Sequence, residues 1–188
     1  LPDPGDSYSY RGSRAPLAAG LRAEREGPPR LAFLKTPAWP QAEEGAREAI
    51  SAFVASLGEA CRETEMPDPF DDILSLHATV MAAEDLAHYG PLLEDCPELL
   101  SDMLKSRMAE AEKIRADDYV KSLLARDELQ RDFAELFENV DAIIALSAPG
   151  PAPLGFETTG NAAFNALWTF LGLPCVSLPL LTVNDLSL

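Results

Sequence analysis

Residues 141–179, which read DAIIALSAPGPAPLGFETTGNAAFNALWTFLGLPCVSLP, decide the fold of this 188-residue chain. Directly after Asp141, an unbroken apolar run reaches Leu146, which is typical of a strand buried on both faces. A loop rich in Pro and Gly follows, and residues 161–171 then favour a helix that Gly172 ends. Residues 174–179 indicate another buried strand. Buried strands joined through helices predict an α/β protein.

The preceding residues extend this pattern. The apolar run Leu31 to Leu34 predicts a buried strand, and residues 59–66 a weak edge strand. Between them, apolar residues at three- and four-residue spacing predict a helix from about Ala42 to Leu57, with Gly58 as its stop signal.

Two further helical regions are expected in the middle of the chain. The first runs from Asp71 to about Tyr89, where Gly90-Pro91 is expected to break it. Its inward side chains should be Ile73, Leu76, Val80 and Met81. The second runs from Pro97 to Asn139 with a break near Asp117.

The domain organisation follows from the composition. Residues 1–30 are rich in Pro, Gly, Ser and Arg and predict an irregular connector, and residues 31–188 form the α/β domain. No apolar stretch approaches the roughly 20 residues that span a bilayer, and no signal peptide is visible. We therefore expect a soluble, cytoplasmic protein without a membrane partner.

Charge and cysteine usage exclude several classes of function. The net charge is −16, from 31 acidic and 15 basic residues, which argues against binding to a phosphate backbone and hence against a nucleic-acid partner. The three cysteines, Cys61, Cys96 and Cys175, have neither disulfide-framework nor zinc-site spacing. Reduced thiols in a cytosol are the better interpretation.

The search for a reaction centre finds none. His77 and His88 lack the spacing of a metal site, so no metal is predicted, and His77 is interpreted as a partly buried packing residue. Cys175 is interpreted as a small buried hydrophobe because no base is near it in the sequence. No nucleophile elbow or phosphate loop occurs, and no cofactor is predicted.

The loop after Leu146 is the most unusual segment. A loop that leaves the carboxyl end of a buried strand is where α/β folds place ligands. Thr158, Thr159 and Asn161 have the hydrogen-bonding groups to line a pocket there. The alternative is a rigid connector in which Thr159 or Asn161 caps the next helix, and the residues alone favour neither.

Several motifs in one order resemble a known family. They are Asp141-Ala-Ile-Ile144, Pro149-Gly-Pro-Ala-Pro153, Thr159-Gly-Asn161, Phe164-Asn-Ala-Leu-Trp168, Gly172-Leu-Pro174 and Ser177-Leu-Pro179. Together they closely resemble the C-terminal part of the amidase-signature enzymes. The resemblance implies a mixed sheet flanked by helices on both faces. It also implies a pocket for a small amide substrate, with Thr158, Thr159, Asn161, Phe164 and Trp168 as lining residues.

The same resemblance implies amide hydrolysis by a Ser–Ser–Lys triad. In the family those residues lie upstream of everything in this sequence. The chain contains no Ser-Ser dipeptide, and none of its four lysines lies in the catalytic context of the family. The expectation is therefore a C-terminal fragment that carries no catalytic residue and is inactive alone.

Two alternatives remain open. One is the A-type subunit of a glutamine-dependent amidotransferase, which the residues Gly160-Asn161-Ala162 disfavour because glutamine-using members carry an acidic residue in this neighbourhood. The other is a non-catalytic interaction module derived from the amidase fold. A truncated sheet would leave strand edges and apolar surface uncovered, so self-association is expected.

Overall fold

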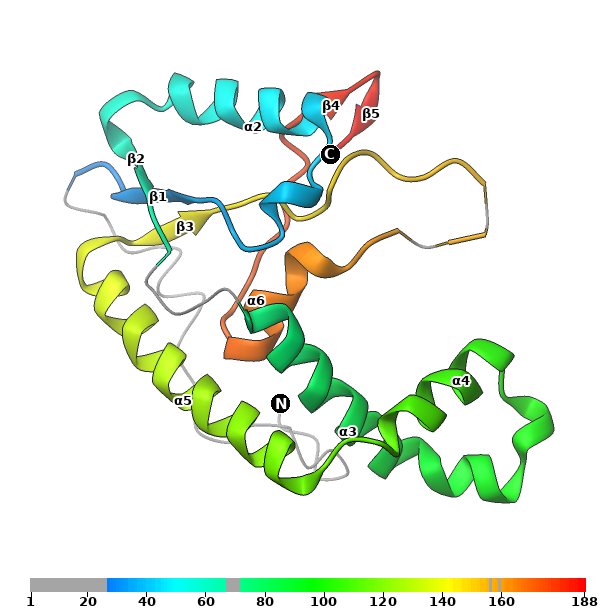
Figure 1. Cartoon of the computed structure of the whole chain (residues 1–188). Coiled ribbons are helices and arrows are strands. Elements are labelled where there is room, and N and C mark those ends of the chain that lie inside the picture. Colours follow the sequence, from blue (N-terminus) through cyan, green and yellow to red (C-terminus); the bar gives the residue numbers. More distant parts are fainter. Residues whose placement is uncertain (1–26, 67–71, 156, 159) are drawn as a thin grey trace, which may run out of the picture.

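The computed structural model describes residues 27–66, 72–155, 157–158 and 160–188. The expected irregular connector therefore lies largely outside the described residues, as does the helix start at Asp71. The described part contains a three-stranded sheet, a two-stranded sheet and several helices, arranged in layers (Figure 1).

The main sheet has the strand order β2-β1-β3 and is parallel throughout. Leu31 of the central strand lies opposite Cys61 on one side and Ala142 on the other. The bounds of the strands are β1 Leu31–Leu34, β2 Cys61–Thr64 and β3 Ala142–Ile144. The predicted α/β class, the strand at 31–34 and the edge strand at 59–66 are confirmed.

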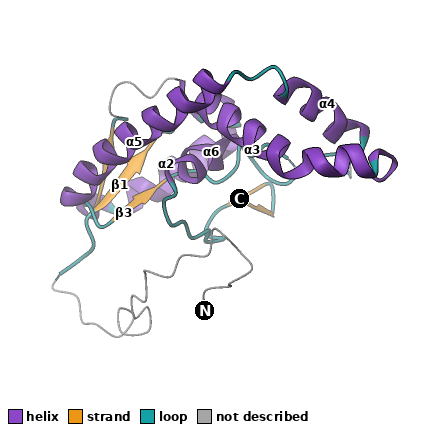
Figure 2. Ribbon diagram, turned by 90° about the horizontal axis from the view of Figure 1, so that it is seen from below, coloured by secondary structure: helices purple, strands orange, loops and turns teal. Residues whose placement is uncertain are grey.

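Helices cover both faces of this sheet (Figures 1 and 2). Helix α2, Glu44–Ser56, packs on the face to which Phe33 points, and Phe33 is only 2% exposed. Leu34 points the opposite way, into a cluster formed largely by α3, α5 and α6. Because successive side chains of a strand alternate between faces, β1 lies between two apolar clusters and contributes side chains to both.

Helix α3 runs over Ile73–Asp95 and continues through Gly90 and Pro91, so the predicted break there is wrong. A proline normally forces the preceding residue out of the helical conformation, because its ring meets that residue's Cβ. Gly90 has no Cβ, which lets the helix pass. Met81 was expected to face inward but is 39% exposed, whereas Ile73 and Val80 are buried as expected.

The second helical region is divided as expected. Helix α4 is Asp102–Ala111 and α5 is Ala116–Asn139, so the break falls at residues 112–115, close to Asp117. Ser101 begins α4, and its hydroxyl accepts a 3.3 Å hydrogen bond from the backbone N–H of Leu104. Short 3-10 turns are η1 Trp39–Gln41, η2 Gly58–Ala60 and η4 Pro97–Leu99.

Three predictions for the C-terminal quarter are wrong. Strand β3 is short and lies at the sheet edge, so the prediction of a strand buried on both faces is wrong. Residues 174–180 form no strand, and Val176 is 83% exposed. Cys175 is likewise exposed rather than buried. A strand needs a neighbour to pair its backbone groups, and the described residues supply none for this segment.

The predicted helix of this quarter is confirmed. Helix α6, Ala163–Leu171, ends at Gly172, whose φ of 65° is the left-handed conformation that glycine adopts most easily. A final antiparallel pair, β4 Thr182–Val183 and β5 Leu186–Ser187, turns through Asn184 and Asp185, both at positive φ. This pair lies beside α2, where Val183 approaches Gly45.

Candidate functional site

The candidate site lies at the carboxyl edge of the main sheet. Parallel strands end together, so the residues that follow β1 and those that follow β3 meet at this edge. Ligands of open α/β sheets bind in this position. After β1 the chain continues into Thr36 and Trp39, and after β3 it enters the Pro-rich loop at Ser147.

Three hydrogen bonds fasten the Pro-rich loop to this edge. The backbone N–H of Glu43 donates to the carbonyl of Pro149 at 2.7 Å. The Asn161 amide donates to Oε1 of Gln41 at 2.7 Å, across 120 residues of sequence. The Asn165 amide donates to the carbonyl of Ser147 at 3.3 Å. The loop is therefore anchored at both of its ends.

Gly150 lets the loop lie close to the start of α2. Gly150 is buried, and a Cβ built on it would fall 2.3 Å from Cδ of Glu43 and about as close to both carboxylate oxygens. The side chain of Glu43 thus occupies the space that any larger residue at position 150 would need. This contact places a carboxylate against the loop at the carboxyl edge of the sheet.

Thr36 contributes a buried hydroxyl. It is only 4% exposed, and its Oγ1 has no hydrogen-bond partner among the described residues. A buried hydroxyl without a hydrogen-bond partner is costly, which makes Thr36 a candidate for contact with a ligand or with a residue outside the described part of the chain. Lys35 precedes it, lies exposed and forms an ion pair with Glu63.

Two cations lie near the ring of Trp39, three residues after Thr36. Nζ of Lys35 lies 5.5 Å from the centroid of the Trp39 ring, and the guanidinium carbon of Arg47 lies 6.0 Å from it. Arg47 also donates to the carbonyl of Pro40 at 2.9 Å. The edge therefore combines a buried hydroxyl, an aromatic ring and charges of both signs, which suits recognition of a polar group.

The five residues predicted to line a pocket lie in different environments in the structure. Thr158 and Asn161 are exposed, and the Thr158 hydroxyl accepts a 3.1 Å hydrogen bond from the backbone N–H of Gly160. Phe164 is 1% exposed and lies in the core against α2. Trp168 packs edge-on against Phe133, with ring centroids 6.2 Å apart. Thr159 lies outside the described residues.

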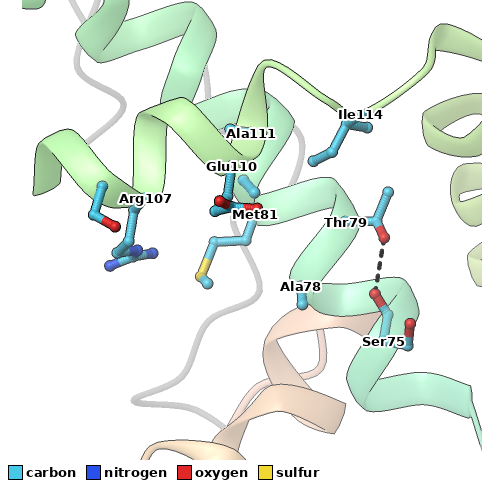
Figure 3. Close-up of a pocket in the computed structure, with 10 residues that line it drawn as sticks. Ser75, Ala78, Thr79, Met81, Arg107, Glu110, Ala111 and Ile114 are labelled. Carbon is cyan, nitrogen blue, oxygen red and sulfur yellow. Dashed lines mark hydrogen bonds between the residues drawn. The ribbon is translucent and has the colours of Figure 1, made fainter. Parts of the chain in front are cut away.

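Asn161 and Phe164 are thus near the carboxyl edge, whereas Trp168 belongs to the cluster on the opposite face. Two cavities of about 420 and 350 Å³ lie along α3, and Figure 3 shows the larger of these two. None of the five residues lines either of them. Asn161 accepts a 2.9 Å hydrogen bond from the backbone N–H of Ala163, although the residue at the cap position of α6 is Ala162. The pocket role stays a prediction.

Sequence reasoning missed Thr36, Gln41, Glu43 and Gly150. Thr36 was recognisable, because it follows an apolar strand at the end where ligands bind. Gln41 and Glu43 carry no such signal, since their importance comes from loop residues more than 100 positions away.

The titratable groups elsewhere agree with packing roles. Burial lowers the pKa of His77, whose ring lies edge-on to Phe170 with centroids 6.4 Å apart. The three cysteines form no disulfide. Burial raises the pKa of the Cys61 thiol, and partial desolvation raises the pKa of the Cys175 thiol although that residue is exposed. In the described part of the chain, no group of three or more metal-ligating side chains occurs, and no helix has the length and apolar character to cross a membrane.

Two curated proteins are similar in sequence. An amidase from Pseudomonas putida is 26% identical over 176 residues, which cover 87% of this chain and 37% of that protein. The A-type subunit of the glutamyl-tRNA(Gln) amidotransferase of Akkermansia muciniphila is 35% identical over 78 residues, or 36% of this chain and 16% of that protein. No family model matches the sequence. The chain spans well under half the length of either relative.

Two solved structures share the fold. One is an inhibitor-bound complex from work on the evolutionary origins of an s-triazine catabolic enzyme. It matches 92% of this chain and 40% of its own, with a TM-score of 0.72 and 20% identity. The other is a crystal structure of an amidase. It matches 88% of this chain and 41% of its own, with a TM-score of 0.68 and 18% identity.

The fold is therefore the α/β fold of the amidases, a parallel sheet flanked by helices. Together with the sequence matches, it confirms the resemblance of this chain to the amidase-signature family.

Proposed function

We propose that this chain forms part of an amidase that hydrolyses a carboxylic acid amide to the acid and ammonia or an amine. The observation that carries the proposal is the similarity to an amidase along 87% of the chain. The catalytic serines and lysine are proposed to lie outside these 188 residues, whose sequence contains no Ser-Ser dipeptide. A cytoplasmic location is part of the same proposal, supported by three cysteines without a disulfide.

The proposed chemistry is acyl transfer. The oxygen of a serine attacks the amide carbon, and its proton passes through a second serine and a neutral lysine to the leaving nitrogen. The C–N bond breaks and leaves an ester on the serine. Water then attacks the ester, the acid is released, and the proton returns to the serine oxygen. Backbone N–H groups stabilise the negative charge on the carbonyl oxygen in both halves of the reaction.

Within this reaction, the chain is proposed to supply one wall of the substrate pocket. The buried hydroxyl of Thr36 and the loop held by Asn161 lie at the edge of the sheet where a ligand of an α/β fold is expected. The Thr36 hydroxyl would gain its missing hydrogen bond from the substrate or from a residue outside the described part of the chain.

The test is an activity assay of the polypeptide encoded by the complete reading frame around Leu1. Ammonia release is measured with an aliphatic amide, an aryl amide and glutamine. Hydrolysis of the simple amides that is lost when a serine of a Ser-Ser segment is replaced by alanine supports the proposal. A reading frame that encodes no Ser-Ser segment contradicts it and favours a non-catalytic interaction module.

A second candidate is the A-type subunit of a glutamine-dependent amidotransferase. The 35% identity over 78 residues to such a protein favours it, whereas Gly160-Asn161-Ala162 lacks the acidic residue expected of glutamine users. In the same assay this candidate predicts ammonia release from glutamine together with copurification of a partner protein. Activity on the simple amides and none on glutamine removes it.

A further inference from the structure

Helices α3 and α4 form a hairpin whose tip projects away from the sheet (Figure 1). We define the hairpin tip as residues 89–103, which comprise the end of α3, the turn η4 and the start of α4. It is not part of the carboxyl edge, and nothing in the amidase proposal uses it.

The hairpin tip exposes large apolar side chains. Tyr89 is 42% exposed, Leu92 45%, Met103 73% and Leu99 77%. Single exposed apolar residues are ordinary, but four of them within 15 consecutive residues are an unusual local concentration. Surfaces of this kind mark sites of protein association.

The same 15 residues carry negative charge only. Glu94, Asp95, Glu98 and Asp102 are all exposed, and the segment contains no Lys or Arg. Lys105 lies 3.7 Å from Asp102, whose side chain is nevertheless fully exposed, so this pair leaves the carboxylate open to a partner. Apolar side chains accompanied by four carboxylates therefore define the chemistry of the tip.

A groove also lies between the two helices, and its lining residues lie outside the hairpin tip. The cavity of about 420 Å³ is lined mainly by α3 and α4, including Met81, Ala82 and Ala111 (Figure 3). At its rim Arg107 and Asp85 form an ion pair at 3.1 Å, so Arg107 does not offset the charge of the tip. An apolar groove between two helices is a shape that receives an amphipathic helix.

We propose that the hairpin tip and this groove dock a cationic amphipathic helix of another protein. Its apolar stripe would cover Leu92, Leu99 and Met103, and its Lys or Arg residues would face the four carboxylates. A second copy of this chain fits less well, because it would bring four more carboxylates to the same place. A lipid surface fits less well too, because anionic headgroups repel an acidic surface.

The test uses a dye-labelled 18-residue peptide of Leu and Lys, with Leu at three- and four-residue spacing. Its binding to the 188-residue chain is followed by fluorescence anisotropy. The double variant Leu99→Ser/Met103→Ser should weaken binding by about tenfold or more, because both side chains are central to the proposed contact. Both residues are exposed, so the fold should persist, which circular dichroism checks.

The matched control is Val120→Ser/Leu124→Ser on α5, whose two side chains are 51% and 60% exposed. This control should change the dissociation constant by less than about twofold. If the tip and control variants weaken binding equally, the peptide is attracted only by the overall charge of −16, and the proposal is overturned.

A second variant separates charge from apolar contact. Glu98→Gln/Asp102→Asn should weaken binding and make it less sensitive to salt, because two of the facing carboxylates are neutralised. Unchanged affinity and salt dependence would remove the cationic partner. Two other results overturn the proposal. If the Leu99→Ser/Met103→Ser variant loses self-association in sedimentation velocity, the tip binds a second copy of this chain. If the chain pellets with phosphatidylcholine–phosphatidylserine vesicles and the same variant does not, the tip binds a membrane.

Discussion

Glu43 and Gly150 are in direct contact across more than 100 residues of sequence. A Cβ at position 150 would lie 2.3 Å from Cδ of Glu43, and the Glu43 backbone N–H donates a 2.7 Å hydrogen bond to the adjacent Pro149 carbonyl. The start of α2 and the loop after β3 are thereby held together at the carboxyl edge of the sheet.

Gly150→Ala is expected to destabilise the protein modestly. The added methyl group must displace the Glu43 carboxylate, and because that side chain is exposed and flexible, the cost should be about 1 kcal/mol, the low end of overpacking. Urea unfolding measures the change. In the double variant Gly150→Ala/Glu43→Ala most of the loss should disappear. An equal loss in both backgrounds would show that the two side chains do not compete for space.

Thr36→Val should not destabilise the protein. The hydroxyl is buried without a partner among the described residues, so replacing it with a methyl group of similar size removes a desolvation cost. We expect a free energy of unfolding that is unchanged or raised by up to about 1 kcal/mol. In the active enzyme the same variant should lower kcat/KM, and Thr36→Ser should keep it. A destabilisation above about 1 kcal/mol would indicate that Thr36 has a structural partner.

The stability should depend on the ionisation of His77. Burial lowers the pKa of His77 in the folded state. As the pH falls, His77 of the unfolded chain is therefore protonated near its ordinary pKa of about 6.5, whereas His77 of the folded chain is protonated only at a lower pH. Stability from this residue is therefore fully present above about pH 7.5, falls as the pH falls through 6.5, and stops falling below the folded pKa.

Thermal unfolding between pH 8 and 5 tests this expectation. His77→Leu should show a smaller loss of Tm on acidification than the unsubstituted chain. Val120→Ser/Leu124→Ser, which removes no ionisable group, is the control and should keep the pH dependence of the unsubstituted chain. An identical pH dependence in the unsubstituted chain and in His77→Leu would contradict the assignment.

The sequence patterns predicted the elements whose signals are local. The apolar run Leu31 to Leu34, the helix closed by Gly58 and the helix closed by Gly172 were all placed correctly, because alternation, helical period and glycine stop signals lie within each element. The predicted end of helix α3 at Gly90-Pro91 came too early. The rule that proline ends a helix depends on a clash with the Cβ of the preceding residue, and Gly90 has no Cβ.

Features set by distant partners were not predictable in this way. Residues 174–179 have the composition of a buried strand, yet in this structure no described strand pairs with them, and they are exposed. At the candidate site, the loop residue Asn161 was recognised from its neighbours, whereas its partner Gln41 depends on a contact over 120 residues.

The exposed segment at residues 174–180 should drive self-association of the isolated chain. Val176 is 83% exposed, Leu178 60% and Leu180 59%, in an extended segment without a strand partner. Sedimentation velocity should show oligomers, and the variant Val176→Ser/Leu178→Ser should shift the population towards monomer. Val120→Ser/Leu124→Ser again serves as control. A monomeric unsubstituted chain at tens of micromolar concentration would contradict this expectation.

The most direct test of the proposed amidase role is intact-mass spectrometry after treatment with a fluorophosphonate, which phosphonylates activated serines with loss of fluoride. The 188-residue chain alone should gain no adduct, and the polypeptide from the complete reading frame should gain one adduct that is lost when its nucleophilic serine is replaced by alanine. A stoichiometric adduct on the 188-residue chain itself would contradict the proposal that the catalytic residues lie outside it.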